Sequence, residues 1–251
     1  MYRCFSSRME RNLTYFASDV HLGFPVGDPV EREQRFVLWL KEIPRDRTRA
    51  LYLLGDIWDF WFEYRDVIPR EGIRVVAQLI DLIDNGVEVY FFEGNHDVWT
   101  FSFFESLGMR KLRQPCFVDI NGMTFCLGHG DGVGGAKPGY RLMMGLFRNK
   151  LAQKLFGSLH PRMAFSVAEF WSRSSRAAHE KYSFVAEREP LYAFAESVLS
   201  ERKVDCFVFG HFHSPVDIRM PGGARFVILR DWMGGGTPCA VLNGPSFELD
   251  C

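Results

Sequence analysis

Residues 50–59 read ALYLLGDIWD, an apolar run that ends abruptly in a glycine and two aspartates. An apolar run of this length, closed by glycine, is typical of a buried strand. In layered α/β folds, the polar residues after such a strand lie at the carboxyl edge of the sheet, where ligands bind. Glycine at this point lets the chain turn sharply and approach an ion closely. The segment therefore predicts a buried strand that delivers Asp56 to a site.

The same arrangement occurs at four other places in the chain. Polar residues follow apolar runs in the segments Asp19-Val20-His21, Gly94-Asn95-His96-Asp97, Gly128-His129-Gly130-Asp131 and Gly210-His211-Phe212-His213. These segments contain five of the seven histidines, which a random placement of core histidines would not produce. A single Asp-x-His or His-x-His is usually incidental, whereas five such strand ends would converge on one rim. The joint pattern predicts a metal site.

The residue types indicate which metals the site would take. Aspartate and histidine together suit ions of intermediate softness, so we expect Mn²⁺, with Fe²⁺ or Zn²⁺ as alternatives. Two ions about 3.5–4 Å apart can hold the attacking and leaving oxygens of an in-line displacement and lower the pKa of a shared water. Such a pair needs one bridging carboxylate, and a neutral asparagine can serve one ion without adding negative charge. We therefore expect two divalent metal ions per chain.

The rest of the chain supplies a framework for these strand ends. We predict strands at 14–18, 50–54, 87–92, 116–120, 123–127, 205–209, 216–220, 224–229 and 239–242, with helices at 31–43, 71–84 and 101–107. Asn121-Gly122, between two apolar runs, is a strong hairpin signal. Residues 138–199 are helical in pattern, without a clear strand. We infer an α/β fold with two sheets, a single domain over residues 1–251 with a helical cap insertion at about 137–199.

Composition excludes several classes of protein. At 251 residues, 47% of them apolar, the chain can bury a full core, and its net charge of −1 argues against a protein that coats nucleic acid. No stretch reaches 18 uninterrupted apolar residues and no secretory signal is recognisable, so we expect a cytoplasmic protein that does not span a membrane. The six cysteines are scattered, which favours reduced thiols over a disulfide framework. We expect neither a nucleic-acid partner nor an obligate protein partner.

The five motifs, in this order, resemble the calcineurin-like metallophosphoesterase family over roughly residues 15–232. The resemblance implies a two-sheet sandwich flanked by helices, with two metal ions at its rim. It implies that the first ion is held by Asp19, His21 and His213, the second by Asn95, His129 and His211, and that Asp56 bridges both. It further implies that His96 is catalytic without ligating: it would donate to a phosphate oxygen and assist the leaving group. Asn95, His96 and His211 would thus also contact the substrate.

Three further carboxylates accompany the motifs: Asp59, Asp97 and Asp131. They could orient the ligand histidines or the loop backbone from behind. They could equally be ordinary turn caps. The sequence leaves both interpretations open.

A narrower resemblance rests on three features. These are the aromatic string GDIWDFWF at 55–62, the segment VILRDW at 227–232, and the helical insertion after Gly-His-Gly-Asp. Together they resemble the UDP-2,3-diacylglucosamine hydrolases, which implies cleavage of a nucleotide-sugar lipid to UMP and 2,3-diacylglucosamine 1-phosphate in lipid A biosynthesis. Two positions depart from that pattern: His96 stands where the best-known members carry arginine, and Lys137 stands where they carry an acidic contact.

The insertion is basic and amphipathic. Residues 137–181 contain nine lysines and arginines against two glutamates, and their leucines, methionines and phenylalanines recur at helical spacing. This composition suits an acylated pyrophosphate and an anionic membrane surface, which would make the protein peripheral on the inner face of the cytoplasmic membrane. Ser174, Arg176 and Lys181 are candidate substrate contacts. The alternative is an apolar stripe that only packs the helices onto the core while the charges are solvated.

Two other functions compete with this hypothesis. A generic metallophosphodiesterase could act on another nucleotide or diester, although a small soluble substrate would not need a basic apolar cap. A catalytically inert binding scaffold would be expected to have lost ligands, whereas all seven ligand positions and His96 carry competent residues here.

Overall fold

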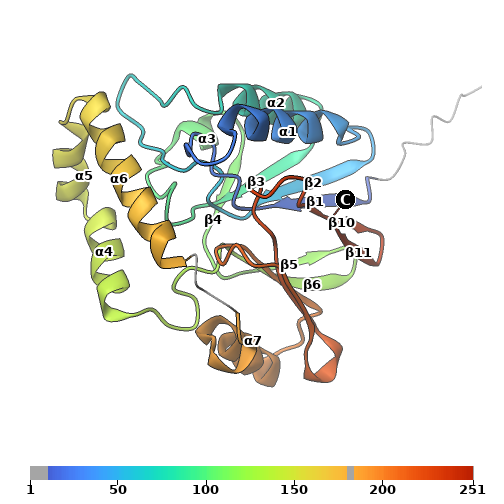
Figure 1. Ribbon diagram of the computed structural model, residues 1–251. Helices are drawn as coiled ribbons and strands as arrows, with labels where there is room; N and C mark the ends of the chain where they lie inside the picture. The colour runs from blue at the N-terminus through green and yellow to red at the C-terminus, as the bar shows by residue number, and fades with distance from the viewer. Residues whose placement is uncertain (1–10, 180–183, 251) are drawn as a thin grey trace, which may run out of the picture.

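The computed structural model describes residues 11–179 and 184–250 and contains two sheets stacked face to face. Helices cover the outer face of each sheet, so the order of layers is helix, sheet, sheet, helix (Figure 1). Three further helices lie beside this sandwich, on the left of the view. The predicted two-sheet α/β architecture with a helical cap is confirmed.

The first sheet has six strands in the order β11-β10-β1-β2-β3-β4. The strands are β1 (Leu13–Ala17), β2 (Thr48–Leu53), β3 (Glu88–Phe92), β4 (Arg110–Leu112), β10 (Ala240–Asn243) and β11 (Ser246–Leu249). Strands β1 to β4 are parallel to one another. On the other side of β1, strand β10 pairs antiparallel with β1, and β11 pairs antiparallel with β10. The carboxyl ends of β1, β2 and β3 therefore lie at one edge of the sheet.

The second sheet has five strands in the order β5-β6-β7-β9-β8. They are β5 (Cys116–Ile120), β6 (Met123–Leu127), β7 (Cys206–Phe209), β8 (Val216–Arg219) and β9 (Arg225–Ile228). The predicted hairpin joins β5 to β6 through Asn121 and Gly122, both with positive φ as a two-residue turn of this kind requires. Strands β6, β7 and β9 are mutually parallel, so their carboxyl ends also share one edge.

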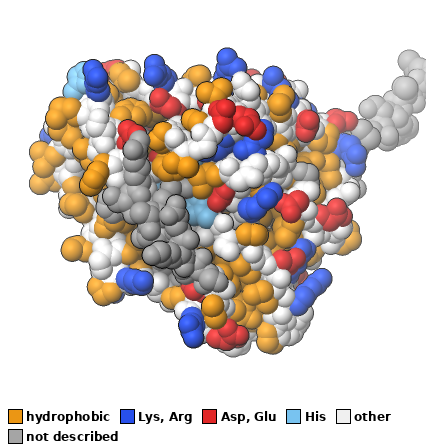
Figure 2. All heavy atoms as spheres, in the orientation of Figure 1, with side chains coloured by type: hydrophobic (Ala, Val, Ile, Leu, Met, Phe, Trp, Pro, Cys, Tyr) orange, Lys and Arg blue, Asp and Glu red, His pale blue; other side chains and the backbone are white. Residues whose placement is uncertain are grey.

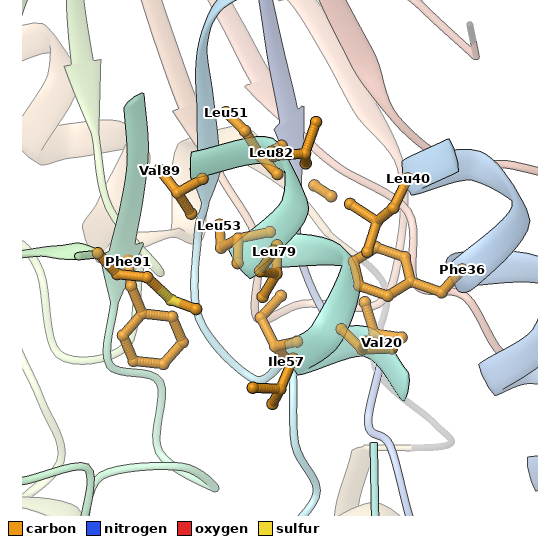
Figure 3. Packing of buried hydrophobic residues seen from close by; sticks show 14 of the residues in the cluster. Val20, Phe36, Leu40, Leu51, Leu53, Ile57, Leu79, Leu82, Val89 and Phe91 are labelled. Carbon is orange, nitrogen blue, oxygen red and sulfur yellow. The ribbon is translucent and has the colours of Figure 1, made fainter. Parts of the chain in front are cut away.

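Helices α1 (Pro29–Glu42) and α2 (Ile73–Asp84) cover the first sheet, next to the short helix α3 (Phe103–Ser106). Strand β2 explains why both faces of this sheet are apolar. Its residues Leu51 and Leu53 pack toward the helices with Phe36 and Leu79 (Figure 3), whereas Tyr52 packs toward the second sheet. This alternation is the expected result of a strand buried on both faces.

The predicted insertion separates into two parts. Helices α4 (Pro138–Arg148), α5 (Lys150–Gly157) and α6 (Pro161–His179) lie beside the sandwich, and we call these three helices the cap. After a 3₁₀ turn (Ala186–Arg188), helix α7 (Pro190–Glu201) packs instead on the second sheet, where Leu191 and Ala195 contact the cluster that contains Phe207. Helix α7 is therefore a core helix of the sandwich.

Three local features were not predicted. The sequence analysis did not predict the short strand β4 or the C-terminal strand β11, because neither contains a long apolar run. Cys239 is disulfide-bonded, so the expectation of reduced thiols is wrong for this residue, although Cys116, Cys126 and Cys206 are free.

Within residues 11–179 and 184–250, no helix is long and apolar enough to cross a membrane.

Candidate metal centre

All five predicted strand ends meet where the edges of the two sheets come together. Asp19, Asp56 and Asn95 follow β1, β2 and β3 of the first sheet, and His129 and His211 follow β6 and β7 of the second. Hydrogen bonds join these turns directly: the Asp19 amide donates to the Gly55 carbonyl (3.1 Å). The Gly210 amide in turn donates to the His129 carbonyl (3.0 Å). The rim is thus a set of loops tied to one another.

Glycine makes this close approach feasible. A Cβ atom on Gly210 would lie 2.2 Å from Asp19 Oδ2, and one on Gly94 would lie 2.1 Å from Asp56 Oδ1. Asp19, Asp56 and His213 themselves have positive φ values of 54°, 51° and 54°, an uncommon conformation for residues with a side chain. Backbone strain of this kind is typical of functional sites, where the surrounding structure holds it in place.

Asp19, His21 and His213 form the first group of ligand-type atoms. Asp19 Oδ1 lies 3.7 Å from His21 Nε2 and 3.8 Å from His213 Nε2. Atoms that share one ion at about 2.1 Å lie about 3–4 Å from one another. The other oxygen, Oδ2, accepts hydrogen bonds from Ser18 and the His211 amide, whereas buried Oδ1 has no hydrogen-bond donor among the described residues. A cation would satisfy that oxygen.

A second group surrounds His129. Its Nε2 lies 3.3 Å from Asn95 Oδ1 and 3.3 Å from Asp56 Oδ2, and its ring lies 5.1 Å from that of His211. Asp56 Oδ2 also lies 3.8 Å from His21 Nε2, which belongs to the first group. One oxygen of Asp56 therefore faces both groups, the position that a bridging carboxylate needs.

The histidine rings are held from behind by oxygen acceptors. His129 Nδ1 lies 2.9 Å from the Leu54 carbonyl, and His213 Nδ1 lies 3.1 Å from Asp231 Oδ2. His21 Nδ1 lies 3.3 Å from Asp59 Oδ1. A proton on Nδ1 of His129 or His213 would be donated to its acceptor, which leaves the Nε2 lone pair of that ring directed at the centre of the site. Metal-binding histidines generally have this second partner.

The charges of the site also call for a cation. Burial raises the pKa of Asp19 and outweighs the opposing effect of the nearby His129. Burial also disfavours the charged form of Asp56, but the imidazoles of His129 and His96 hold its pKa well below the usual range. Burial likewise lowers the pKa of His129, yet Asp56 raises it well above its ordinary value. A divalent ion would supply the positive charge instead and leave His129 neutral for coordination.

His96 lies at the side of the two groups. Its Nδ1 is 3.1 Å from the Asp59 carbonyl oxygen and 3.4 Å from Asp59 Oδ1, so its Nε2 is the nitrogen left for another molecule. The His96 amide donates to Asp56 Oδ1 (2.9 Å), which fixes the turn. His96 and Asn95 also border a cavity beneath the cap. The geometry suits a group that contacts a substrate.

The three accompanying carboxylates have different environments. Asp97 accepts four backbone N–H bonds, from Asp56, Ile57, Trp58 and Gly94, and thus holds the loop that carries Asp56. Asp59 faces the imidazoles of His21, a proposed ligand, and His96, as expected for a carboxylate that orients both rings. Asp131 instead accepts hydrogen bonds from Gln114 and Tyr140.

The cavity beneath the cap has a volume of about 480 Å³. Asp59, Asn95 and His96 form the polar part of its lining, and apolar residues of the cap form most of its wall, among them Leu146, Leu155 and Phe156. Three hydrogen bonds between described residues join the cap to the sandwich: from Trp99 Nε1 to the Phe147 carbonyl (2.8 Å), from Ser172 Oγ to Asp59 Oδ1 (2.8 Å), and from the Tyr140 hydroxyl to Asp131 Oδ2 (2.5 Å). The metal centre is thus bordered directly by a cavity whose wall is mostly apolar.

Sequence reasoning missed two residues of this site. Asp231 was noted only as part of a family string, and its contact with His213 depends on the turn after β9. Ser172 is fully buried against Asp59, but nothing in its sequence context distinguishes it from the other serines of α6. The predicted contacts Ser174 and Arg176 lie on α6, and their side chains fall outside the described part of the chain, as does Lys181.

Known proteins resemble this chain over most of its length. The calcineurin-like phosphoesterase family matches residues 14–215. A UDP-2,3-diacylglucosamine hydrolase of Porphyromonas gingivalis is 39% identical over 96% of this chain and 97% of its own. Proteins of the same name from Stenotrophomonas maltophilia and Aeromonas salmonicida are 30% and 28% identical, over 94% and 92% of this chain and 97% and 90% of their own. The chain therefore belongs to the calcineurin-like phosphoesterase family and is a metal-dependent hydrolase of phosphoric esters or anhydrides.

Proposed function

We propose that the chain hydrolyses the pyrophosphate of UDP-2,3-diacylglucosamine to UMP and 2,3-diacylglucosamine 1-phosphate, a step of lipid A biosynthesis. The observation that carries the proposal is the apolar cavity of about 480 Å³ that ends at Asn95 and His96. A substrate with a charged pyrophosphate beside acyl chains matches a chamber that is polar at one end and apolar along its wall. The names of the relatives from three bacteria support the same substrate.

We further propose two divalent ions, with Mn²⁺ as the expected metal. Asp19, His21 and His213 would hold one ion, Asn95, His129 and His211 the other, and Asp56 both. Bound ions would lower the pKa of an attacking water and stabilise the charge that develops on the phosphate. The unsatisfied oxygen of Asp19 and the position of Asp56 between the two groups support this assignment.

His96 is the proposed catalytic residue of the chain itself. Because its Nδ1 faces Asp59, its Nε2 is free to donate a hydrogen bond to a non-bridging phosphate oxygen and to assist the leaving group. Asp59 holds the imidazole in that orientation. Asn95 and His211 would contact the same phosphate, and Ser174, Arg176 and Lys181 remain the proposed contacts from the cap.

The cap also supports a location on the inner face of the cytoplasmic membrane. Leu142, Leu151 and Phe170 expose 78%, 66% and 76% of their surface on the three cap helices. Hydrophobic side chains gather on this side of the molecule, with basic residues above and below (Figure 2). Exposed apolar residues on basic amphipathic helices favour attachment to an anionic bilayer surface. The proposed partners are the lipid substrate and the membrane, without nucleic acid.

A direct test compares substrates on the Mn²⁺-loaded enzyme. We expect rapid release of UMP from UDP-2,3-diacylglucosamine and slow turnover of bis-p-nitrophenyl phosphate and of cyclic nucleotides. Preference for a small diester would instead favour the generic phosphodiesterase. Absence of turnover with every substrate and metal would favour an inert scaffold.

A further inference from the structure

A second hollow, of about 430 Å³, lies on the other side of helix α5 from the substrate cavity. It is bordered by Phe62, Tyr64 and Arg65 from the loop after β2, by Phe101 before α3, and by Lys150 and Lys154 of α5. We call this hollow the basic groove. Phe62 separates it from the substrate cavity, since the ring of Phe62 packs 5.1 Å from that of Phe156, which lines the cavity wall.

The charge of the basic groove is not neutralised by the chain. Glu63 is the acidic residue among those that line it, and both of its oxygens accept N–H bonds from Ser102 (2.7 Å) and Phe103 (3.0 Å) at the start of α3. Arg65, Lys150 and Lys154 form no ion pair with any residue in the described part of the chain. Lys150 and Lys154 also repel each other across one helical turn. A bound anion would stabilise all three cations.

The same groove has an apolar component. Phe101 exposes 39% of its surface beside it, and Leu151 is exposed on α5 next to Lys150. The Tyr64 hydroxyl is buried and has no hydrogen-bond partner among the described residues, so it offers a donor to an incoming oxygen. Cations, a hydroxyl donor and adjoining apolar side chains are complementary to a phosphate that carries hydrocarbon chains.

We propose that the basic groove binds the headgroup phosphate of an anionic phospholipid. The acyl chains of that phospholipid lie against Phe101 and Leu151. This inference deepens the proposed function, on which it rests, because a docked phospholipid places the substrate cavity on the other side of Phe62 at the bilayer surface. The basic groove would thus bind one phospholipid headgroup at a defined site, in addition to the attraction between the basic cap and an anionic bilayer.

The experiment uses the full chain loaded with Mn²⁺. Binding to phosphatidylcholine vesicles, with and without phosphatidylglycerol, is measured by co-sedimentation for the wild type and two charge-matched variants. Lys150→Gln/Lys154→Gln changes the groove, whereas Lys41→Gln/Arg49→Gln changes two exposed cations of the sandwich. Each lysine near an anionic surface contributes about a fivefold factor, so the groove variant should bind about thirtyfold more weakly. The control variant should bind nearly as well as the wild type.

A soluble probe separates a site from diffuse attraction. Short-chain dihexanoyl phosphatidylglycerol, used as a monomer in calorimetry, should bind the wild type and the control, and should fail to bind the groove variant. Phe101→Ala, which leaves the charge unchanged, should weaken this binding severalfold. Equal vesicle binding by the two paired variants, or no binding of the short-chain lipid, would overturn the proposal. Inorganic phosphate that binds as tightly as the lipid would also overturn it and reveal a site for free anions.

Activity is measured in parallel to keep the two proposals distinct. All variants should hydrolyse bis-p-nitrophenyl phosphate at the wild-type rate, because none of the changed residues belongs to the metal centre or the cavity. If the wild type binds the short-chain lipid but does not release UMP from UDP-2,3-diacylglucosamine, the proposed substrate fails while the headgroup site stands.

Discussion

The metal centre and the cap differ in how their residues are held. At the rim, Asp19, His21 and His129 are completely buried, and the ligand loops are hydrogen-bonded to one another. In the cap, long apolar side chains such as Leu142 and Leu146 are mostly exposed. Hydrogen bonds that involve Phe147, Ser172 and Tyr140 of the cap fix its position on the sandwich.

This difference assigns separate tasks to the two regions. A rigid, buried rim can hold ions and a phosphate within the small tolerances that such chemistry needs. Its residues act on the phosphate, which all candidate substrates share. The apolar cavity wall is supplied by the cap, so the identity of the substrate should depend on the cap. Substitutions at the rim should therefore slow the hydrolysis of every substrate, whereas substitutions in the cavity wall should affect only the hydrolysis of the lipid substrate.

The largest effect is expected at Asp56. We predict that Asp56→Ala abolishes turnover of the lipid and of bis-p-nitrophenyl phosphate alike and lowers the metal content, because one oxygen of Asp56 faces both ligand groups. Asn95→Ala, which removes a neutral ligand of one group, should be less severe. Elemental analysis of the purified variants measures the ions per chain. Two tightly retained ions in Asp56→Ala would show that the bridge is elsewhere.

His96 should give the next largest effect. We predict that His96→Ala keeps its metals and loses turnover by about 10²–10³, the usual cost of one donor to the transition state. The loss should appear in kcat with both substrates, since His96 acts on the phosphate they share. His96→Arg should retain part of the activity with the lipid. Wild-type kcat in His96→Ala at saturating metal is incompatible with the proposed role.

Asp231 tests whether the rim also depends on residues behind the ligands. We predict that Asp231→Asn weakens metal binding by about 10–100-fold, because the acceptor of His213 Nδ1 loses its charge. At saturating Mn²⁺ the kcat should return close to that of the wild type. The measurement is activity as a function of Mn²⁺ concentration, with the exposed Asp84→Asn as the control. An unchanged Mn²⁺ requirement would contradict the prediction.

The smallest effect, confined to one substrate, is expected in the cap. Leu146→Gln/Leu155→Gln places polar groups in the cavity wall and should raise the KM for UDP-2,3-diacylglucosamine about tenfold, from the loss of partly buried apolar contact. Hydrolysis of bis-p-nitrophenyl phosphate should be unchanged. Leu142→Gln/Leu151→Gln is the matched control, since these leucines are exposed on the same helices but do not line the cavity. Assays in detergent remove any contribution from membrane binding.

Losses on both substrates, together with a lowered melting temperature in the Leu146→Gln/Leu155→Gln variant, would mean that these leucines mainly stabilise the cap. Unchanged kinetics with the lipid would separate the cavity from acyl-chain binding and strengthen the generic phosphodiesterase. Either outcome would remove the distinction between a rim for chemistry and a cap for specificity.

The sequence was informative where a local pattern has one structural meaning. The run ALYLL before Gly55 identified the buried strand β2, and Asn121-Gly122 identified the hairpin between β5 and β6. Short elements such as β4 and β11 have no comparable pattern and form because a neighbouring strand offers them an edge. Helix α7 has the periodicity of a cap helix, and only its packing against the second sheet shows that it belongs to the core.

By itself, then, the sequence determined the order of the elements and the residue types at the strand ends, since both depend on near neighbours in the chain. The tertiary structure decided the rest: that Asp231 lies behind His213, that Ser172 reaches Asp59, and that Phe62 separates a cavity from a basic groove. These contacts join residues far apart in the chain. Their distances are set by how sheets and helices pack, and no local pattern encodes that packing.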